Sequence, residues 1–213
     1  MVKSSGEEET CMSLNVMRNI EYIFPTPVYT ATNVCIDIID HLRKETYTLK
    51  DKYKTVRTPS LNVDSSHQTA SRDIFNHFYF SRLKTELQKH VNDFVESLGG
   101  YDDTVEITNM WFNCSDKSDF NFPHSHGGSV ISGVYYIESA ADSYLRFYNN
   151  TYLVSNAIAP NNVNESSFPA YDIPCEKGKL LMWQGHVIHG NPAQTLEGEK
   201  IAVSFNTSFI ITK

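Results

Sequence analysis

The sequence predicts an α+β protein in which N-terminal helices support a β-sandwich or jelly roll. Apolar residues recur at helical spacing before residue 100, and after it the period changes to the two-residue alternation of strands. At 213 residues, with 40% hydrophobic and 20% charged side chains, the chain is long enough for a single domain with a substantial core.

The N-terminal part is expected to contain a leader, an entry strand and two helices. Residues 1–18 are polar and acidic, and we interpret them as a flexible leader before one domain over residues 19–213. Residues 20–29 are expected to be extended. Amphipathic helices are expected within about 33–100, because two apolar stripes lie there between polar residues: Val34, Cys35, Ile38, Ile39, Leu42, and Phe80, Leu83, Leu87, Val91, Phe94, Val95, Leu98.

The C-terminal part, about 104–211, is expected to consist of strands. Alternating apolar residues predict them at Val105–Asn113, Val130–Ile137, Tyr144–Phe147, Lys179–Trp183 and Ile201–Ile211. The connection over residues 149–178 is polar, rich in proline and asparagine, and too long for a simple hairpin. We therefore expect it to be a lid or substrate loop.

Composition excludes several classes of function. The net charge of −7 argues against a nucleic-acid partner, because phosphate binding requires an excess of Lys and Arg or a basic stripe. No apolar run approaches the roughly 20 residues of a membrane span. The four cysteines have no C-x-x-C spacing, and no apolar segment follows the acidic N-terminus as in a secretory signal. We expect a cytoplasmic protein without a membrane or nucleic-acid partner, and a homo-oligomer is compatible with the sequence.

Three histidines form the candidate metal site. His124 and His126 are two residues apart, so on an extended chain both imidazoles face the same side. Imidazole pairs suit iron, zinc, copper or nickel, and an open site of two histidines and a carboxylate is typical of iron(II) oxygenases. A third ligand must come from elsewhere, and His189, just beyond a predicted strand, is the candidate.

Five short motifs resemble a known family when their order and spacing are taken together. They are Trp111-Phe-Asn113, Pro123-His124-Ser-His126, Ser132-Gly-Val-Tyr-Tyr-Ile137, Gly178-x-Leu180 leading to His189, and Lys200-Ile-Ala-Val-Ser-Phe-Asn206. This pattern, over roughly residues 105–210, is similar to 2-oxoglutarate/Fe(II) oxygenases of phages and marine bacteria. The resemblance implies a double-stranded β-helix, a jelly-roll or cupin-like barrel, with N-terminal helices. It also implies that the protein uses Fe(II) and 2-oxoglutarate as cofactors and reacts with O2. If a phage encodes the chain, the resemblance implies a location in the host cytoplasm.

The resemblance also implies roles for individual residues. Lys200 stands where the family pattern has arginine, and it would bind the distal carboxylate of 2-oxoglutarate through one ammonium group instead of a bidentate fork. Tyr136 and Asn113 are candidate hydrogen-bond partners of 2-oxoglutarate. Ser204 and Asn206 share a strand face with Lys200, so they are expected in the same pocket.

The metal ligands admit two arrangements, because the superfamily has H-x-D or H-x-E where this chain has His126. Either His124, His126 and His189 all bind the metal, or His126 binds it and Gly128 occupies the carboxylate position, which leaves one coordination site open for halide or water. We favour three histidines, because the two-residue spacing supplies them without further assumptions.

Two other functions remain open from the sequence. A cupin-type metalloenzyme would have a similar H-x-H pair but needs no cation at Lys200, and it would have a glutamate shortly after His126, where the first carboxylate is Glu138. A non-enzymatic jelly-roll binding module would bind no iron. The expected function is hydroxylation of an unidentified small molecule or protein side chain, with 2-oxoglutarate converted to succinate.

Overall fold

A computed structural model describes residues 25–52, 55–57, 67–69, 71–149 and 168–210. The predicted leader, residues 20–24 of the predicted entry segment and residues 150–167 of the predicted lid lie outside this described part. No helix among the described residues has the length and apolar character that a membrane span requires.

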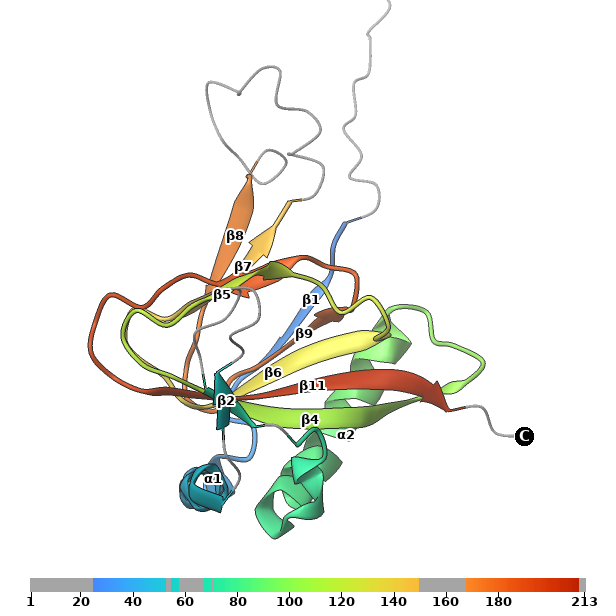
Figure 1. Cartoon of the computed structure of the whole chain (residues 1–213). Coiled ribbons are helices and arrows are strands. Elements are labelled where there is room, and N and C mark those ends of the chain that lie inside the picture. The colour runs from blue at the N-terminus through green and yellow to red at the C-terminus, as the bar shows by residue number, and fades with distance from the viewer. Residues whose placement is uncertain (1–24, 53–54, 58–66, 70, 150–167, 211–213) are drawn as a thin grey trace, which may run out of the picture.

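Two antiparallel sheets face each other (Figure 1). The larger sheet has the order β1 (Val28–Ala31), β9 (Leu180–Gln184), β6 (Ile131–Glu138), β11 (Lys200–Ile210), β4 (Thr104–Ser115), β3 (His67–Thr69), β2 (Thr55–Arg57). The smaller sheet has the order β5 (Asn121–His124), β10 (His189–Asn191), β7 (Tyr144–Tyr148), β8 (Ala170–Pro174). No ladder joins the two sheets in the described residues, so the expected barrel is not closed.

Two helices cover the outer face of the larger sheet (Figure 1). They are α1 (Ile39–Lys52) and α2 (Phe78–Ser97), each preceded by a short 3-10 turn, Ile36–Ile38 and Ile74–Asn76. The first helix begins later than the sequence predicts, because Asn33 and Cys35 adopt left-handed backbone conformations, with φ of 59° and 48°, that an α-helix does not accept. The apolar stripe of α2 is buried as expected, from Phe80 to Phe94.

The alternation along the central strands divides the core into two layers. On β6, Tyr135 and Ile137 face the helices, whereas Val134 and Tyr136 face the smaller sheet. The same alternation holds on β4, β9 and β11, so each of these strands contributes to the helix-side core and to the space between the sheets. The functional site therefore has to be sought between the sheets.

All five predicted C-terminal strands are present, with ends shifted by a few residues. The description of residues 149–178 as one connection is wrong in its second half, because β8 lies within it. Strand β8 pairs along its whole length with β7, and Asn149 N–H donates to Pro169 O at 3.0 Å where the hairpin begins to open. Strands β5 and β10 were also not predicted, although they carry two of the candidate metal ligands.

Candidate metal centre

Two of the three histidines form a cross-strand pair in the smaller sheet. His124 ends β5, His189 begins β10, and the two residues are directly opposite each other in the ladder. Their ring centroids are 4.5 Å apart. His189 is only 5% exposed, packed against the rings of Trp183 and Phe147, whereas His124 lies at the exposed edge.

His126 reaches the same point by a different route from the one the sequence suggested. Strand β5 ends at His124, so the two histidines do not share one extended strand. Instead, His126 lies in the loop after β5, where its backbone N–H donates to Gly185 O at 2.8 Å and its carbonyl accepts from Ser129 N–H at 2.8 Å. This loop places the His126 ring 5.2 Å from both other histidine rings.

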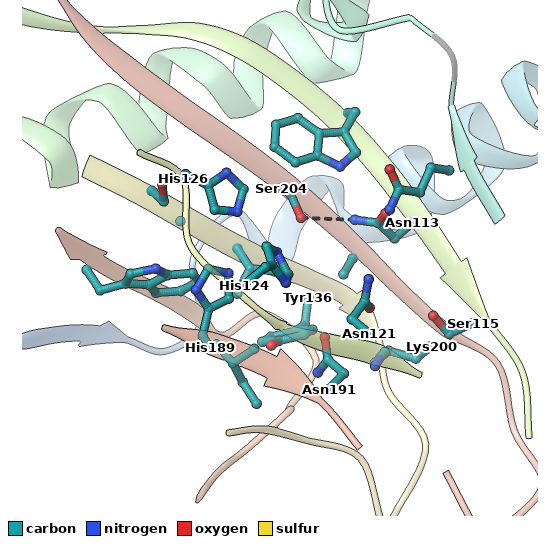
Figure 2. A pocket seen from close by; sticks show the side chains of 18 residues that line it. Asn113, Ser115, Asn121, His124, His126, Tyr136, His189, Asn191, Lys200 and Ser204 are labelled. Atoms are coloured by element: carbon teal, nitrogen blue, oxygen red, sulfur yellow. Dashed lines mark hydrogen bonds between the residues drawn. The ribbon is translucent and has the colours of Figure 1, made fainter. Parts of the chain in front are cut away.

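The three histidines can hold a metal ion. One ring nitrogen from each lies within 4.8 Å of the other two (Figure 2). Burial, reinforced by the nearby His124, lowers the pKa of His126 to about 4 and that of His189 to about 3. Both imidazoles are therefore neutral at pH 7, which is the form that binds metal. Gly128 is not among the residues that line the cavity.

A cavity runs between the sheets from the histidines to Lys200. Figure 2 shows the histidines at one end, Lys200 at the other and Tyr136 between them. Lys200 is 4% exposed and begins β11, opposite Ser115 of β4. No aspartate or glutamate is among the lining residues of the described part, so the cavity combines a buried cation with three imidazoles in a chain of net charge −7.

Three buried polar atoms in this cavity have no hydrogen-bond partner among the described residues: Asn113 Oδ1, Tyr136 Oη and Trp183 Nε1. Such atoms are costly unless a ligand pairs with them. Burial raises the pKa of Tyr136 well above its usual value, so its hydroxyl keeps its proton and can donate. The amide of Asn113 donates to Ser204 Oγ at 2.9 Å, which leaves its carbonyl as an acceptor. The cavity thus fits a polar organic ligand beside a metal ion.

The structure brings together seven of the eight residues that the sequence suggested. His124, His126, His189, Lys200, Tyr136, Asn113 and Ser204 all line the cavity, and Asn206 does not. Asn206 lies on β11 opposite Ser132, and Ser132 Oγ donates to its side-chain carbonyl at 2.9 Å.

Several lining residues were missed. Gln68, Ser115, Asn121, Asn191 and Trp183 also line the cavity. Ser115 could have been found, since it lies two residues after Asn113 on the same strand. Asn121 and Asn191 are on strands that the sequence did not predict. Trp183, which ends a predicted strand, is 2% exposed and faces the cavity.

Several solved structures have a similar fold. A prolyl-4-hydroxylase from Pseudomonas putida aligns with a TM-score of 0.63 and 11% identity over 86% of this chain and 92% of that chain. The 2-oxoglutarate-dependent carbocyclase SnoK of nogalamycin biosynthesis aligns with a TM-score of 0.65 and 8% identity over 85% of this chain and 79% of that chain. HygX from Streptomyces hygroscopicus, solved with nickel and 2-oxoglutarate, aligns with a TM-score of 0.55 and 13% identity over 86% of this chain and 82% of that chain. These likenesses confirm the predicted double-stranded β-helix fold.

At the sequence level, one family model matches, and no curated protein does. The model is that of the family described as "Putative 2OG-Fe(II) oxygenase", and it matches residues 109–206. That segment contains all three histidines and Lys200. The match, together with the histidine cluster inside it, indicates a 2OG-Fe(II) oxygenase, an oxidoreductase that uses Fe(II) and 2-oxoglutarate.

Proposed function

We propose that this oxygenase hydroxylates an organic substrate with its metal held by His124, His126 and His189. The overall reaction is R–H + 2-oxoglutarate + O2 → R–OH + succinate + CO2, in which one oxygen atom enters the product and the other enters succinate. The observation that carries this proposal is a single cavity with three converging imidazoles at one end and a buried lysine at the other.

Each end of the cavity suits one end of 2-oxoglutarate. Lys200 binds the distal carboxylate, because a buried carboxylate requires a cation to offset its loss of hydration. The Tyr136 hydroxyl donates a hydrogen bond in the same region, and Asn113 with Ser204 lines the neighbouring wall. When bound, Fe(II) and 2-oxoglutarate supply the activation of O2 and the oxidation of the substrate.

The protein's own contribution is to position these groups and to limit access of water. The rings of Trp183 and Phe147 pack around His189 and keep it almost fully buried. His124, at the exposed end, marks the side from which substrate reaches the metal. A small molecule or a protein side chain is the substrate class we propose, while a cytoplasmic location and a phage origin stay predictions from the sequence.

Succinate formation tests the proposal. The full-length protein is incubated with Fe(II), 2-oxoglutarate, ascorbate and O2, and succinate is measured in the absence of added substrate, where slow uncoupled turnover is expected. His189→Gln should lose this turnover. His186→Gln is the matched control, because His186 is exposed, lies three residues away and does not line the cavity.

The other two functions give different results in the same series. Tight metal binding without succinate formation, and without an absorption band on adding 2-oxoglutarate to the Fe(II) protein, would favour a cupin-type enzyme. Failure to bind any divalent metal would favour a non-enzymatic module. Either result would contradict the oxygenase.

A further inference from the structure

Arg72 is an exposed cation that packs against a wall of the cavity. Its guanidinium carbon lies 4.5 Å from the centroid of the Trp111 ring, which is the geometry of a cation–π contact. Trp111 is 8% exposed and lines the cavity, and its ring is stacked on the ring of His126 with 6.1 Å between the centroids. A single indole therefore lies beside both Arg72 and a candidate metal ligand.

The backbone holds Arg72 at this place. Met110 N–H donates to Arg72 O at 2.7 Å, and the next residue, Asp73, forms a parallel bridge with Met110. Met110 precedes Trp111 on β4, the strand that also brings Asn113 to the cavity. Main-chain bonds therefore fix the position of the arginine relative to the cavity, and a side-chain substitution leaves them in place.

The guanidinium of Arg72 has no ion-pair or hydrogen-bond partner in the described part of the chain. The carboxylate of the adjacent Asp73 instead accepts hydrogen bonds from Ser71 and Asn76. Partial loss of hydration lowers the pKa of Arg72, and no neighbouring carboxylate raises it. A guanidinium stays protonated at any physiological pH, and packing its face on an indole leaves the N–H groups in its plane free to bind an anion.

The cavity beside this cation is poor in negative charge. No aspartate or glutamate lines it among the described residues, and a third histidine stands where iron sites of two histidines and a carboxylate have one negative charge. The two carboxylates of bound 2-oxoglutarate balance only the charge of a divalent metal. The charge of Arg72 is thus available for a further anionic group, and guanidinium groups bind carboxylate and phosphate through two parallel hydrogen bonds.

We infer that Arg72 is a substrate-binding residue and that the substrate is an organic anion, whose carboxylate or phosphate group binds the guanidinium while the reacting carbon lies at the histidines. This inference rests on the proposed function, because it takes the cavity to be an oxygenase active site. Arg72 is exposed and does not itself line the cavity, so the anionic group binds at the surface beside Trp111. Lys200, which serves 2-oxoglutarate, lies at the opposite end from the histidines (Figure 2).

Three small probes test this inference by binding alone. The full-length protein is loaded with Zn(II), which has no redox chemistry, and with saturating 2-oxoglutarate, so that Lys200 is occupied. Benzoate, benzamide and phenyl phosphate are titrated separately. Binding is followed by tryptophan fluorescence, because both tryptophans of the chain, Trp111 and Trp183, line the cavity. Benzoate and benzamide have nearly the same shape and differ in charge, so benzoate should bind at least about tenfold more tightly.

Arg72→Gln should weaken benzoate binding at least about tenfold and remove the preference over benzamide. Arg72→Lys keeps the charge without the bidentate fork and should give an intermediate loss. Arg82→Gln is the matched control, because Arg82 is an exposed arginine that pairs with Asp37 and does not line the cavity. Co(II) binding, followed by visible absorption, should be no weaker in Arg72→Gln than in wild type, since the change removes a positive charge near His126 and no candidate ligand.

Phenyl phosphate identifies the anion: tighter binding than benzoate assigns a phosphate group to the substrate, and weaker binding assigns a carboxylate. If benzoate and benzamide bind equally, or if Arg72→Gln binds benzoate like wild type, the inference is wrong, while succinate formation still supports the proposed function. Benzoate binding that is lost in Lys200→Ala and kept in Arg72→Gln would assign the anion to Lys200 and overturn the inference. Weaker binding of benzoate, benzamide and Co(II) alike in Arg72→Gln would overturn it too, since it indicates a role in folding. Arg72-dependent benzoate binding in a protein that forms no succinate would contradict the proposed function and leave the anion site at Arg72 standing.

Discussion

At the scale of single residues, the site depends on groups whose charge and protons are fixed before any ligand binds. His126 and His189 are neutral at pH 7 because burial depresses their pKa values to about 4 and about 3. Lys200 supplies a cation to the same cavity, and no carboxylate lines it in the described part of the chain. The cavity is thus prepared for a metal ion at one end and an anion at the other.

Lys200→Ala should raise the 2-oxoglutarate concentration needed for half-saturation at least about tenfold, since a hydrogen bond to a charged group contributes about 1.5–3 kcal/mol. Titration of the Fe(II) protein with 2-oxoglutarate, followed by its metal-to-ligand absorption band, measures this. Metal affinity should stay near wild type. Lys179→Ala is the control, because Lys179 is a buried lysine outside the cavity that pairs with Glu176. Unchanged 2-oxoglutarate affinity in Lys200→Ala would exclude this role.

Trp183→Phe should separate stability from ligand binding. It removes the buried Nε1–H, which has no partner among the described residues, and keeps an aromatic ring against His189. Loss of an unpaired donor costs the metal-free protein little beyond the smaller ring. If a cavity ligand accepts from Nε1, the rise in Tm caused by Mn(II) and 2-oxoglutarate should be smaller than in wild type. The same rise in both proteins would mean that the ligand does not use this donor.

At the scale of elements, the sequence predicted the helices and strands that have a clear hydrophobic periodicity, and it missed the short strands that form only through pairing with other strands. The stripe of α2 and the alternation of β4, β6 and β11 are long enough to be recognised. Strands β5 and β10 have four and three residues, and they are extended because they pair with each other and because β10 also pairs with β7. Periodicity over so few residues carries no signal.

The same limit explains the mixed outcome for the site. The sequence correctly predicted that His124 and His126 lie close together, but it assumed that both are on one extended strand. Only His124 is on a strand, and a loop anchored to Gly185 positions His126. Lys200, Ala202 and Ser204 face the cavity as alternation predicts. Alternation also placed Asn206 on that face, but Asn206 does not line the cavity, and its side-chain carbonyl accepts a hydrogen bond from Ser132 Oγ.

Gly190→Ala should disturb the pairing of β5 with β10. A Cβ at Gly190 would lie 2.8 Å from Asn121 O and 3.1 Å from Phe122 C, both in the backbone of β5. The strand carrying His124 would have to move, which should cost about 1–3 kcal/mol of stability and weaken Co(II) binding at least about tenfold. Gly127→Ala is the control, because a Cβ there meets no atom within 4 Å. Wild-type Co(II) affinity in Gly190→Ala would show that β5 tolerates the shift.

At the scale of the whole molecule, the residues proposed to bind the metal and the 2-oxoglutarate carboxylate come from different sheets. His124 and His189 belong to the smaller sheet, and Lys200 begins the last strand of the larger one. The larger sheet is buttressed by α1 and α2, and the long pairing of β4 with β11 runs through its centre. The smaller sheet has four short strands, and β5 is at its edge. Bound cofactors would therefore connect a well-supported sheet to a less supported one.

Metal binding should accordingly protect the smaller sheet. A metal at 100 times its Kd adds about 2.7 kcal/mol to stability, which corresponds to a rise in Tm of about 5–10 °C for a chain of this size. Hydrogen exchange measured with and without Mn(II) should slow in residues 121–126 and 189–191, because the metal joins the end of β5 to β10. It should change little in residues 105–113, which pair with β11 and do not contact the metal.

Adding 2-oxoglutarate to the Mn(II) protein should extend that protection to the start of β11, because its distal carboxylate would bind Lys200 in the larger sheet. The extension should disappear in Lys200→Ala, while protection of residues 121–126 by Mn(II) remains. His189→Gln should abolish both steps, and His186→Gln should abolish neither. If 2-oxoglutarate protected β11 equally in Lys200→Ala, the carboxylate would have to bind elsewhere in the cavity, and the two sheets would not be connected through this residue.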